Sequence, residues 1–365
     1  MISGLTGRIL RLTLATVLAV AGWACAPGEP VASEEAVFRG ETMGTYYVVK
    51  VAAQVPVAEL LGLQSDIEER LVAINDRMST YQDDSELSRF NQRQDTEPAE
   101  VSQALFEVVA TAQQVAEDTG GAFDVTVGPL VNAWGFGPTG VPEPKVDEAE
   151  QLRLLELIGW QKLELTPGAV PGGGGGDGSP MLRKLHPELY VDLSGIAKGF
   201  AVDALTDLLA EHGYAATWVE VGGEVRASGL SGRGAPWRLG IERPSEQPGV
   251  VQRIVPLSDA AVATSGDYRN YIEVEGRRVS HLLDPRRAEP IGHRLASVSV
   301  VDDRCMIADA LATALMVMGE DEGLRWAEEH GVAALFLVRE GDGFVEFATS
   351  TFDRQVEQAN GHPAP

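Results

Sequence analysis

The sequence predicts an α+β fold in which helices surround a strand-rich, antiparallel core. Two observations carry this prediction. Helical patterns recur near both ends of the chain, and they flank a long stretch, residues 217–301, that is rich in strand and turn patterns. Helices gathered around consecutive strands indicate layered α+β architecture, whereas a doubly wound sheet would alternate the two. At 44% hydrophobic and 23% charged residues, the chain has the composition of a globular protein with a sizeable core.

The first predicted elements are a strand and three helices. Residues 40–53 alternate aromatic and β-branched side chains, as a strand does. Apolar residues recur every three or four positions in 58–77 and again in 102–119, so each segment predicts an amphipathic helix. Gly120-Gly121 ends the second of these helices, and a third is predicted over 148–158.

Residues 167–180 form a low-complexity insertion with five consecutive glycines. Glycine loses the most backbone entropy on ordering, so we expect a flexible surface loop between two strands of one domain. A linker between two domains is the alternative. The elements expected after the insertion are a strand at 189–193, helices at 196–212, 306–318 and 320–330, strands at 333–338 and 343–347, and a polar C-terminal tail at 351–365.

The N-terminus has the pattern of an export signal. Arg8 and Arg11 accompany an apolar run that is too short to span a bilayer, so residues 1–24 are predicted to be a signal peptide. Ala24 precedes Cys25, as at a bacterial lipoprotein site, and we expect Cys25 to carry lipid. Residues 25–36 would then tether a domain at 37–350 to the extracytoplasmic face of a membrane, with the inner membrane favoured. An ordinary secreted protein with a free thiol is the alternative.

Charge and cysteine content exclude several classes of protein. The chain has 54 acidic and 29 basic residues, a formal net charge of −25, which argues against binding to nucleic acid. Its two cysteines, Cys25 and Cys305, exclude a disulfide framework and argue against a zinc–thiolate site. The sequence also lacks a Walker P-loop, a dinucleotide-binding glycine motif and a His-Glu-x-x-His pair.

Two motifs place polar residues where a ligand could bind. Asp192-Leu-Ser-Gly-Ile-Ala-Lys-Gly199 is predicted to join a strand to a helix, so that backbone amides and Lys198 offer an anion site; the alternative is that Ser194 caps the helix. Asp309 and Thr313 are spaced i, i+4 on one helix face, and their hard oxygen donors suit magnesium. The alternative for Asp309 is complementarity to the helix dipole.

Two further motifs are less specific. Ser280-His-Leu-Leu-Asp-Pro285 is predicted to end a strand, where a structural role for His281 is the alternative to a functional one. Residues 122–137 combine Asp124 with Trp134 and Phe136, which predicts either buried aromatic side chains or an aromatic surface for a planar ligand.

Taken together, these motifs resemble the ApbE family, the FAD:protein FMN transferases. The resemblance covers about residues 37–350. The elements that carry it occur in family order: Met43-Gly-Thr45, Met78-Ser-Thr-Tyr81, Phe123-Asp-Val-Thr-Val-Gly-Pro129, Asp192 to Gly199, Val221-Gly-Gly-Glu224, Thr264-Ser-Gly266, Ser280 to Pro285, and Ala308-Asp-Ala-Leu-Ala-Thr313. The chain departs from the family pattern after Pro285, at 286–289, where we expect a differently shaped turn, and at Ala312, where the family often has an acid.

The resemblance implies a single ApbE-like (T-fold-like) domain that binds FAD between its strands and its helices. It implies that magnesium is held at the FAD pyrophosphate, and that FMN passes to a Thr or Ser hydroxyl of an acceptor subunit in a membrane electron-transport complex, releasing AMP. FAD binding without transfer and a magnesium-dependent FAD pyrophosphatase are the alternatives.

The site residues that the resemblance implies fall into three groups. The magnesium ligands would be Asp309, Thr313 and the backbone carbonyl of Gly195. The FAD-binding residues would be Met43, Tyr81, Ala122, Phe123, Asp124, Asp192, Lys198 and Leu283. The catalytic residues would be Asp309 and His281, with His281 as the base for the acceptor hydroxyl.

Overall fold

The structure is a computed structural model that describes residues 35–53, 55–138, 146–168, 178–245, 249–268, 271–274 and 277–359. The predicted signal peptide, Cys25 and nearly all of the predicted tether lie outside the described residues. Among the described residues, no helix combines the length and the apolar character that crossing a membrane requires.

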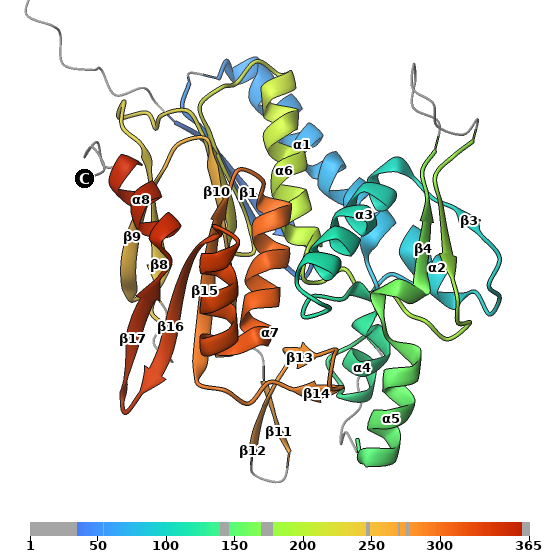
Figure 1. The fold of residues 1–365 in the computed structure, drawn as a ribbon. Helices are drawn as coiled ribbons and strands as arrows, with labels where there is room; N and C mark the ends of the chain where they lie inside the picture. Colours follow the sequence, from blue (N-terminus) through green and yellow to red (C-terminus); the bar gives the residue numbers. More distant parts are fainter. Residues whose placement is uncertain are drawn as a thin grey trace, which may run out of the picture. The chain divides into compact units, whose positions relative to one another are not determined.

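Eight of the described strands form one antiparallel sheet, in the order β1-β2-β6-β7-β10-β15-β16-β17 (Figure 1). Their bounds are β1 Ala36–Thr42, β2 Thr45–Val51, β6 Thr217–Val221, β7 Glu224–Ser228, β10 Ala260–Gly266, β15 Leu295–Asp302, β16 Ala333–Glu340 and β17 Gly343–Ala348. The prediction of a strand-rich antiparallel core is therefore confirmed. Alternating side chains along β15 and β16 are buried on both faces of the sheet, so each face needs its own cover.

Helices cover one face of this sheet. They are α1 (Val57–Met78), α6 (Ala197–Glu211) and α7 (Cys305–Glu329), with α3 (Gln103–Asp118) packed beside them (Figure 1). The predicted apolar stripe of α1 is buried in the main core, with Ile67 fully inaccessible to solvent. Because α6 and α7 pack against each other and against the central strands, their N-terminal turns are fixed relative to the sheet.

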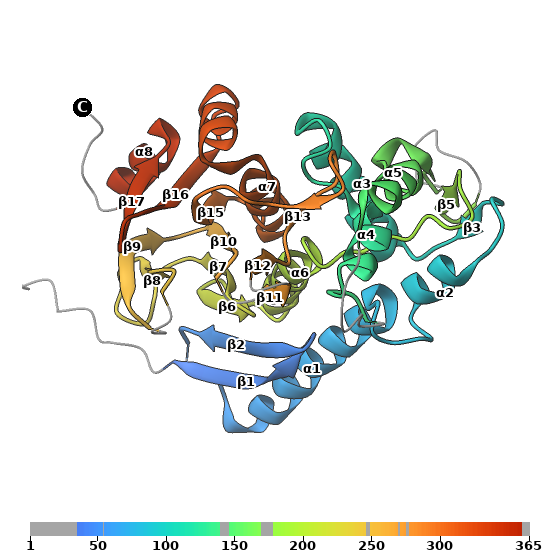
Figure 2. The ribbon, with the colours of Figure 1, turned by 90° about the horizontal axis from the view of Figure 1, so that it is seen from below.

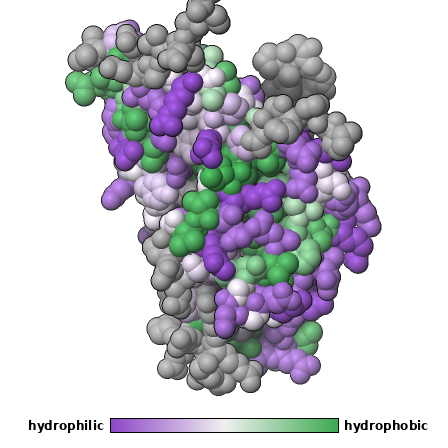
Figure 3. All heavy atoms as spheres, turned by 90° about the vertical axis from the view of Figure 1, so that its left-hand side faces the viewer, coloured by the Kyte–Doolittle hydropathy of each residue, from purple (hydrophilic) through white to green (hydrophobic). Residues whose placement is uncertain are grey.

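A second, smaller core lies on the other face. It is covered by the hairpin of β8 (Trp237–Glu242) and β9 (Val251–Leu257) and by α8 (Ser350–Ala359), as Figure 2 shows. The prediction of a polar tail from residue 351 therefore does not hold for α8, because Phe352 and Val356 are buried in this core. Figure 3 shows the outer side of the molecule here, where hydrophobic and hydrophilic residues both reach the surface. Ile254 on β9 and Phe347 on β17 are among the exposed apolar residues.

Smaller elements complete the fold. β4 (Leu163–Thr166) and β5 (Met181–Lys184) pair antiparallel across the Gly-rich insertion, which accordingly joins two strands of one small sheet. The other elements are α2 (Glu86–Gln92), β3 (Ala99–Glu100), α4 (Gly128–Ala133), α5 (Glu148–Leu157), β11 (Tyr271–Val274), β12 (Arg277–Ser280), β13 (Leu283–Asp284) and β14 (Glu289–Pro290).

The structure differs from the sequence prediction at three places. The strand expected over 40–53 is a hairpin, because Met43 and Gly44 both have positive φ and form a two-residue turn between β1 and β2. The strand expected over 189–193 is irregular. The two helices expected over 306–330 form one element, α7, with a kink at Gly319 (φ 80°).

Candidate active site

A cavity of about 860 Å³ opens between the strands of the main sheet, the N-terminal turns of α6 and α7, and the loops before α4 and after β12. All but one of the site residues inferred from sequence line it. These are Tyr81, Ala122, Phe123, Asp124, Asp192, Gly195, Lys198, His281, Leu283, Asp309 and Thr313. The fold thus gathers motifs from distant parts of the chain into one site.

Met43 is the exception. It does not belong to the cavity lining; instead it lies in the β1–β2 turn with φ 51° and packs partly buried against the main core. The neighbouring Tyr46, on β2, does line the cavity, and its hydroxyl donates to Glu220. In this structure β2 therefore meets the cavity through Tyr46.

A lysine held between two carboxylates lies at the inner end of the site. Nζ of Lys198 is 3.5 Å from Oδ1 of Asp309 and 3.3 Å from Oε1 of Glu224. Burial alone would lower the pKa of Lys198, but the two carboxylates outweigh it and raise that pKa. Burial raises the pKa of Glu224 to about 8, and Lys198 opposes that rise. The cluster therefore places both acidic and basic groups beside the cavity, in a region of restricted solvent access.

Glu224 has a second feature that the sequence did not reveal. Its Oε2 is buried and, among the described residues, has no hydrogen-bond partner. The Val221-Gly-Gly-Glu224 motif contributed to the family resemblance, yet no site role followed from it. The signal was present as an acid after two glycines in a strand-to-strand turn, but its proximity to Lys198 depends on how β7 packs against α6.

Asp309 is oriented by the neighbouring helix. Its Oδ2 accepts a hydrogen bond from the backbone N–H of Gly199 on α6 at 3.0 Å. The first amides of α7 are instead satisfied by Asp203 of α6, which accepts from Cys305 and Met306, both at 3.0 Å. The acid that complements the N-terminus of α7 is thus Asp203, and Asp309 does not cap its own helix.

Thr313 lies one turn further along α7 and faces the loop before α6. Its hydroxyl is 3.1 Å from Oγ of Ser265 on β10. A Cβ added to Gly195 would lie 3.3 Å from Thr313 Oγ1, so a residue without a side chain allows the backbone at 195 to approach this hydroxyl. The carboxylate of Asp309, this hydroxyl and the backbone at 195 are the oxygen donors that magnesium prefers.

The described residues offer no group of three or more His, Cys, Asp or Glu side chains that could hold a metal ion. A site here would therefore use one carboxylate together with hydroxyl and backbone oxygens, which suits magnesium and does not suit zinc. The donor set at Asp309, Thr313 and Gly195 has this composition, and it fits the group that the resemblance implies.

The turn into α6 lines the cavity, but most of its amides already have acceptors: Ile196 and Ala197 donate to the Leu193 carbonyl, and Gly199 donates to Asp309. The helix begins at Ala197, and within the described chain its N-cap, Ile196, makes no side-chain capping bond. The interpretation of Ser194 as the cap is therefore not supported; Ser194 is exposed and lines the cavity. Asp192 accepts from the Ser194 amide at 2.8 Å and shapes the turn that leads into the helix.

Two phenylalanines form the aromatic side of the cavity: Phe136 follows α4, and Phe123 lies in the loop before that helix. Asp124 braces this loop: its Oδ1 accepts from the amide and the hydroxyl of Thr126, and its Oδ2 accepts from the amide of Trp160. Burial raises the pKa of Asp124, and these hydrogen bonds oppose the rise. The carboxylate of Asp124 thus joins the start of this loop to the segment at Trp160.

His281 lies where β12 ends, beside Phe136. Its ring meets Phe136 edge-on, with centroids 6.3 Å apart. Leu283 follows in β13, which also borders the cavity. The turn after Pro285 contains no glycine, and the buried Ala288 adopts the left-handed conformation there, with φ 55°.

Comparison with known proteins identifies the family. A profile of the ApbE family matches residues 43–336. The chain belongs to the ApbE family. An FAD:protein FMN transferase of Vibrio cholerae is 45% identical over 320 residues, which cover 88% of this chain and 92% of that protein. One of Escherichia coli K12 is 36% identical, covering 89% and 90% of the two chains.

Solved structures of ApbE proteins share this α+β fold. The flavin transferase ApbE of Vibrio cholerae superimposes with a TM-score of 0.77 at 44% identity, covering 88% of this chain and 99% of that one. The flavinyl transferase ApbE of Pseudomonas stutzeri, in its apo form, gives 0.78 at 40% identity, covering 88% and 97%. The predicted fold class and family are therefore both confirmed.

Proposed function

We propose that this protein transfers FMN from FAD to a Thr or Ser hydroxyl of an acceptor protein and releases AMP. The observation that carries the proposal is the gathering of the motif residues around one cavity, in a chain 45% identical over 88% of its length to an FAD:protein FMN transferase. The cavity lies in the volume range of small-molecule sites and combines aromatic walls with convergent polar groups.

The reaction forms one bond and breaks another at a single phosphorus. The acceptor hydroxyl oxygen attacks the FMN phosphorus of FAD, the bridging P–O bond breaks, and AMP leaves with the bridging oxygen. His281 takes the hydroxyl proton, since its imidazole is the basic group at the outer side of the cavity. Phosphoryl transfer depends mainly on positioning and charge neutralisation. Lys198 lines the cavity at the N-terminal end of α6, and both its charge and the helix dipole favour the anionic pyrophosphate there.

Magnesium would be held by Asp309, Thr313 and the backbone carbonyl of Gly195. When bound there, it supplies charge neutralisation for the pyrophosphate oxygens. The protein's own contribution is orientation: Gly199 fixes Asp309 through one carboxylate oxygen, and Ser265 lies in hydrogen-bond contact with Thr313. These contacts hold the donors in place before any ion arrives.

One assay separates this proposal from its two alternatives. The protein is incubated with FAD, MgCl₂ and a purified electron-transport subunit that an ApbE relative flavinylates, and AMP release and in-gel flavin fluorescence are followed. We expect AMP and labelled acceptor in equal amounts. AMP with free FMN and unlabelled acceptor would indicate a pyrophosphatase, and FAD binding without AMP would indicate a carrier. Either of these results would contradict the proposal.

The location of the protein is part of the same proposal. The export pattern of residues 1–24 and the Ala24-Cys25 junction support an extracytoplasmic, lipid-anchored enzyme whose acceptor is a membrane electron-transport subunit. Metabolic labelling with a fatty acid should mark the wild-type protein and fail to mark Cys25→Ser, which should leave the membrane fraction. Labelling of Cys25→Ser to the wild-type level would contradict the anchor.

A further inference from the structure

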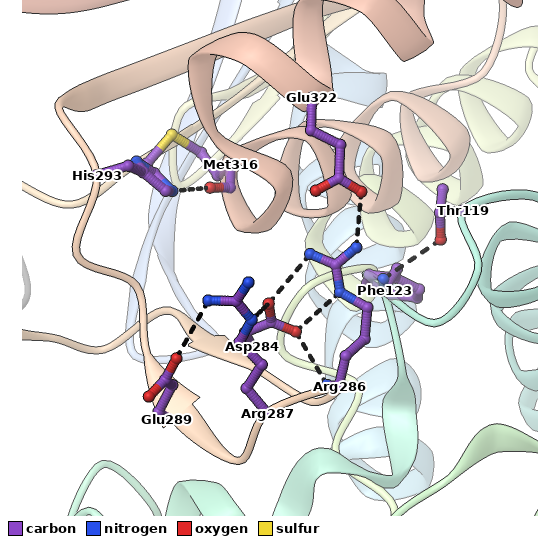
Figure 4. A network of polar contacts seen from close by, with 9 residues as sticks. All are labelled: Thr119, Phe123, Asp284, Arg286, Arg287, Glu289, His293, Met316 and Glu322. Atoms are coloured by element: carbon purple, nitrogen blue, oxygen red, sulfur yellow. Dashed lines mark hydrogen bonds and ion pairs between the residues drawn. The ribbon is translucent and has the colours of Figure 1, made fainter.

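The turn that follows His281 carries an arginine, Arg286, that contacts three segments of the chain near the cavity. The Arg286 guanidinium donates to both carboxylate oxygens of Asp284, from Nε to Oδ1 and from Nη2 to Oδ2, each at 3.0 Å. Its Nη1 donates to Oε1 of Glu322 on α7 at 2.8 Å. Figure 4 shows the guanidinium between these two carboxylates, which belong to different segments of the chain.

The aliphatic part of Arg286 meets a third segment. A Cβ added to Gly121 would lie 3.9 Å from Cγ of Arg286, so the arginine passes alongside the turn that precedes Ala122, Phe123 and Asp124. Asp284 is 6% exposed. A bidentate pair with such a buried carboxylate fixes both distance and orientation, which a single charged contact does not.

Several side chains attach the segment between His281 and β15 to α7, among them Arg294, whose Nε lies 3.3 Å from Oε1 of Glu320. Besides the Arg286–Glu322 contact, His293 hydrogen-bonds through Nε2 to the Met316 carbonyl at 2.8 Å, beside the kink at Gly319 (Figure 4). His281 is three residues before Asp284, in a stretch held by only short strands, β12 and β13. Its position relative to α7 therefore depends on these attachments together with the burial of Leu282 and Leu283.

We propose that Arg286 is a positioning residue for FMN transfer, which fixes the His281–Asp284 segment against α7 so that the His281 imidazole stays at the acceptor side of the cavity. This inference rests on the proposed function, because it takes His281 as the base. Arg286 does not line the cavity, and it acts through the segment that it holds.

The neighbouring arginine provides a matched control. Arg287 carries the same charge, but its side chain is 71% exposed, and its contacts are longer, 4.0 Å to Asp284 and 3.5 Å to Glu289. The test uses the full-length protein with FAD, MgCl₂ and the same acceptor subunit. It measures kcat and the KM for FAD from in-gel flavin fluorescence, and the Kd for FAD alone from flavin fluorescence quenching.

We expect Arg286→Ala to lower kcat about tenfold, because a loosened base loses its near-attack geometry, and to change the KM and Kd for FAD less than threefold. Arg286→Lys should recover little of this loss, since an ammonium cannot make the bidentate contact. Arg287→Ala should keep kcat within twofold of the wild type. An unchanged kcat in Arg286→Ala, or a loss confined to FAD affinity, would overturn the inference.

A second variant covers the case in which Arg286→Ala does not fold. Glu322→Gln weakens only the attachment to α7, and we expect it to lower kcat about threefold without changing the Kd for FAD. A kcat equal to that of the wild type would also overturn the inference. The two hypotheses fail differently: absence of transfer by the wild-type protein contradicts the proposed function, whereas transfer that is indifferent to Arg286 and Glu322 contradicts this inference alone.

Discussion

The buried carboxyl of Glu224 should make the stability of the protein depend on pH, and Glu224→Gln should remove that dependence. The side chain is 4% exposed, and burial raises its pKa to about 8 from the ordinary 4.5. Between pH 4.5 and about 8, the Glu224 carboxyl is therefore protonated in the folded state and ionised in the unfolded state. Since the folded state binds more protons in this window, the free energy of unfolding falls as the pH rises through it.

The size of the effect follows from proton linkage. One proton gives a slope of at most about 1.4 kcal/mol per pH unit, so between pH 6 and pH 7.5 the wild-type protein should lose up to about 2 kcal/mol through Glu224. Glutamine keeps an oxygen that can face Lys198, 3.3 Å from Glu224 Oε1 in the structure, but it does not titrate. The free energy of unfolding of Glu224→Gln, relative to that of the wild type, should therefore rise by about 2 kcal/mol from pH 6 to pH 7.5.

Urea unfolding, followed by tryptophan fluorescence at pH 6, 6.75 and 7.5 with EDTA present, measures this difference. A series in 1 M NaCl is the control, because salt screens the many surface charges and leaves a buried pair largely unaffected. The slope that depends on Glu224 should persist at high salt. Parallel pH profiles for the wild type and Glu224→Gln would refute the reasoning, since they would mean that Glu224 is already ionised throughout the interval.

Three further predictions concern the metal donors and the helix that carries them. Asp309→Ala should reduce AMP release and acceptor labelling at least about 100-fold and abolish the heat of MgCl₂ binding in calorimetry; unchanged turnover would rule out Asp309 as a ligand. Gly195→Ala places a methyl group 3.3 Å from Thr313 Oγ1 and 3.1 Å from Phe123 Cε2, so the MgCl₂ concentration for half-maximal activity should rise about tenfold, and an unshifted titration would contradict the close approach. Asp203→Ala should lower the free energy of unfolding by about 3 kcal/mol, because it leaves Arg226 and two amides of α7 without their acceptor. A loss below about 1 kcal/mol in urea unfolding would show that this acceptor is dispensable.

Periodic patterns in the sequence predicted the long helices correctly, and they placed Asp309 and Thr313 on one face of a helix. The apolar spacing within α1 and α3 is local information, and so is the i, i+4 spacing that puts Asp309 and Thr313 on the cavity side of α7. The hairpin of β1 and β2 was read as one strand because the alternation continues through the turn at Met43 and Gly44. A two-residue turn leaves little trace in such a pattern when its first residue is apolar.

The partners of the charged residues could not be predicted, because they are set by packing between distant segments. Lys198 was expected to offer positive charge to a ligand, yet in the structure it also balances Glu224 and Asp309. The resemblance predicts that Asp124 binds FAD; in the structure it lines the cavity, and its carboxylate accepts hydrogen bonds from Thr126 and Trp160. In both cases the residue type was informative about the site, while its partners lie 26 to 111 positions away in the chain or in a local turn.

The strand order of the main sheet also has a consequence for how the chain folds as it is made. Each strand of the sheet lies beside the strand that precedes it within the sheet, from β1 to β17. A chain that emerges N-terminus first can add every new strand to the open edge left by the last one, and none has to be inserted between strands already paired. The longest delay between two neighbouring strands is that between β2 and β6: the free edge of β2 stays unpaired until α1, α3 and α6 have been synthesised and β6 follows. Chaperone protection of the growing chain would therefore matter most over that interval.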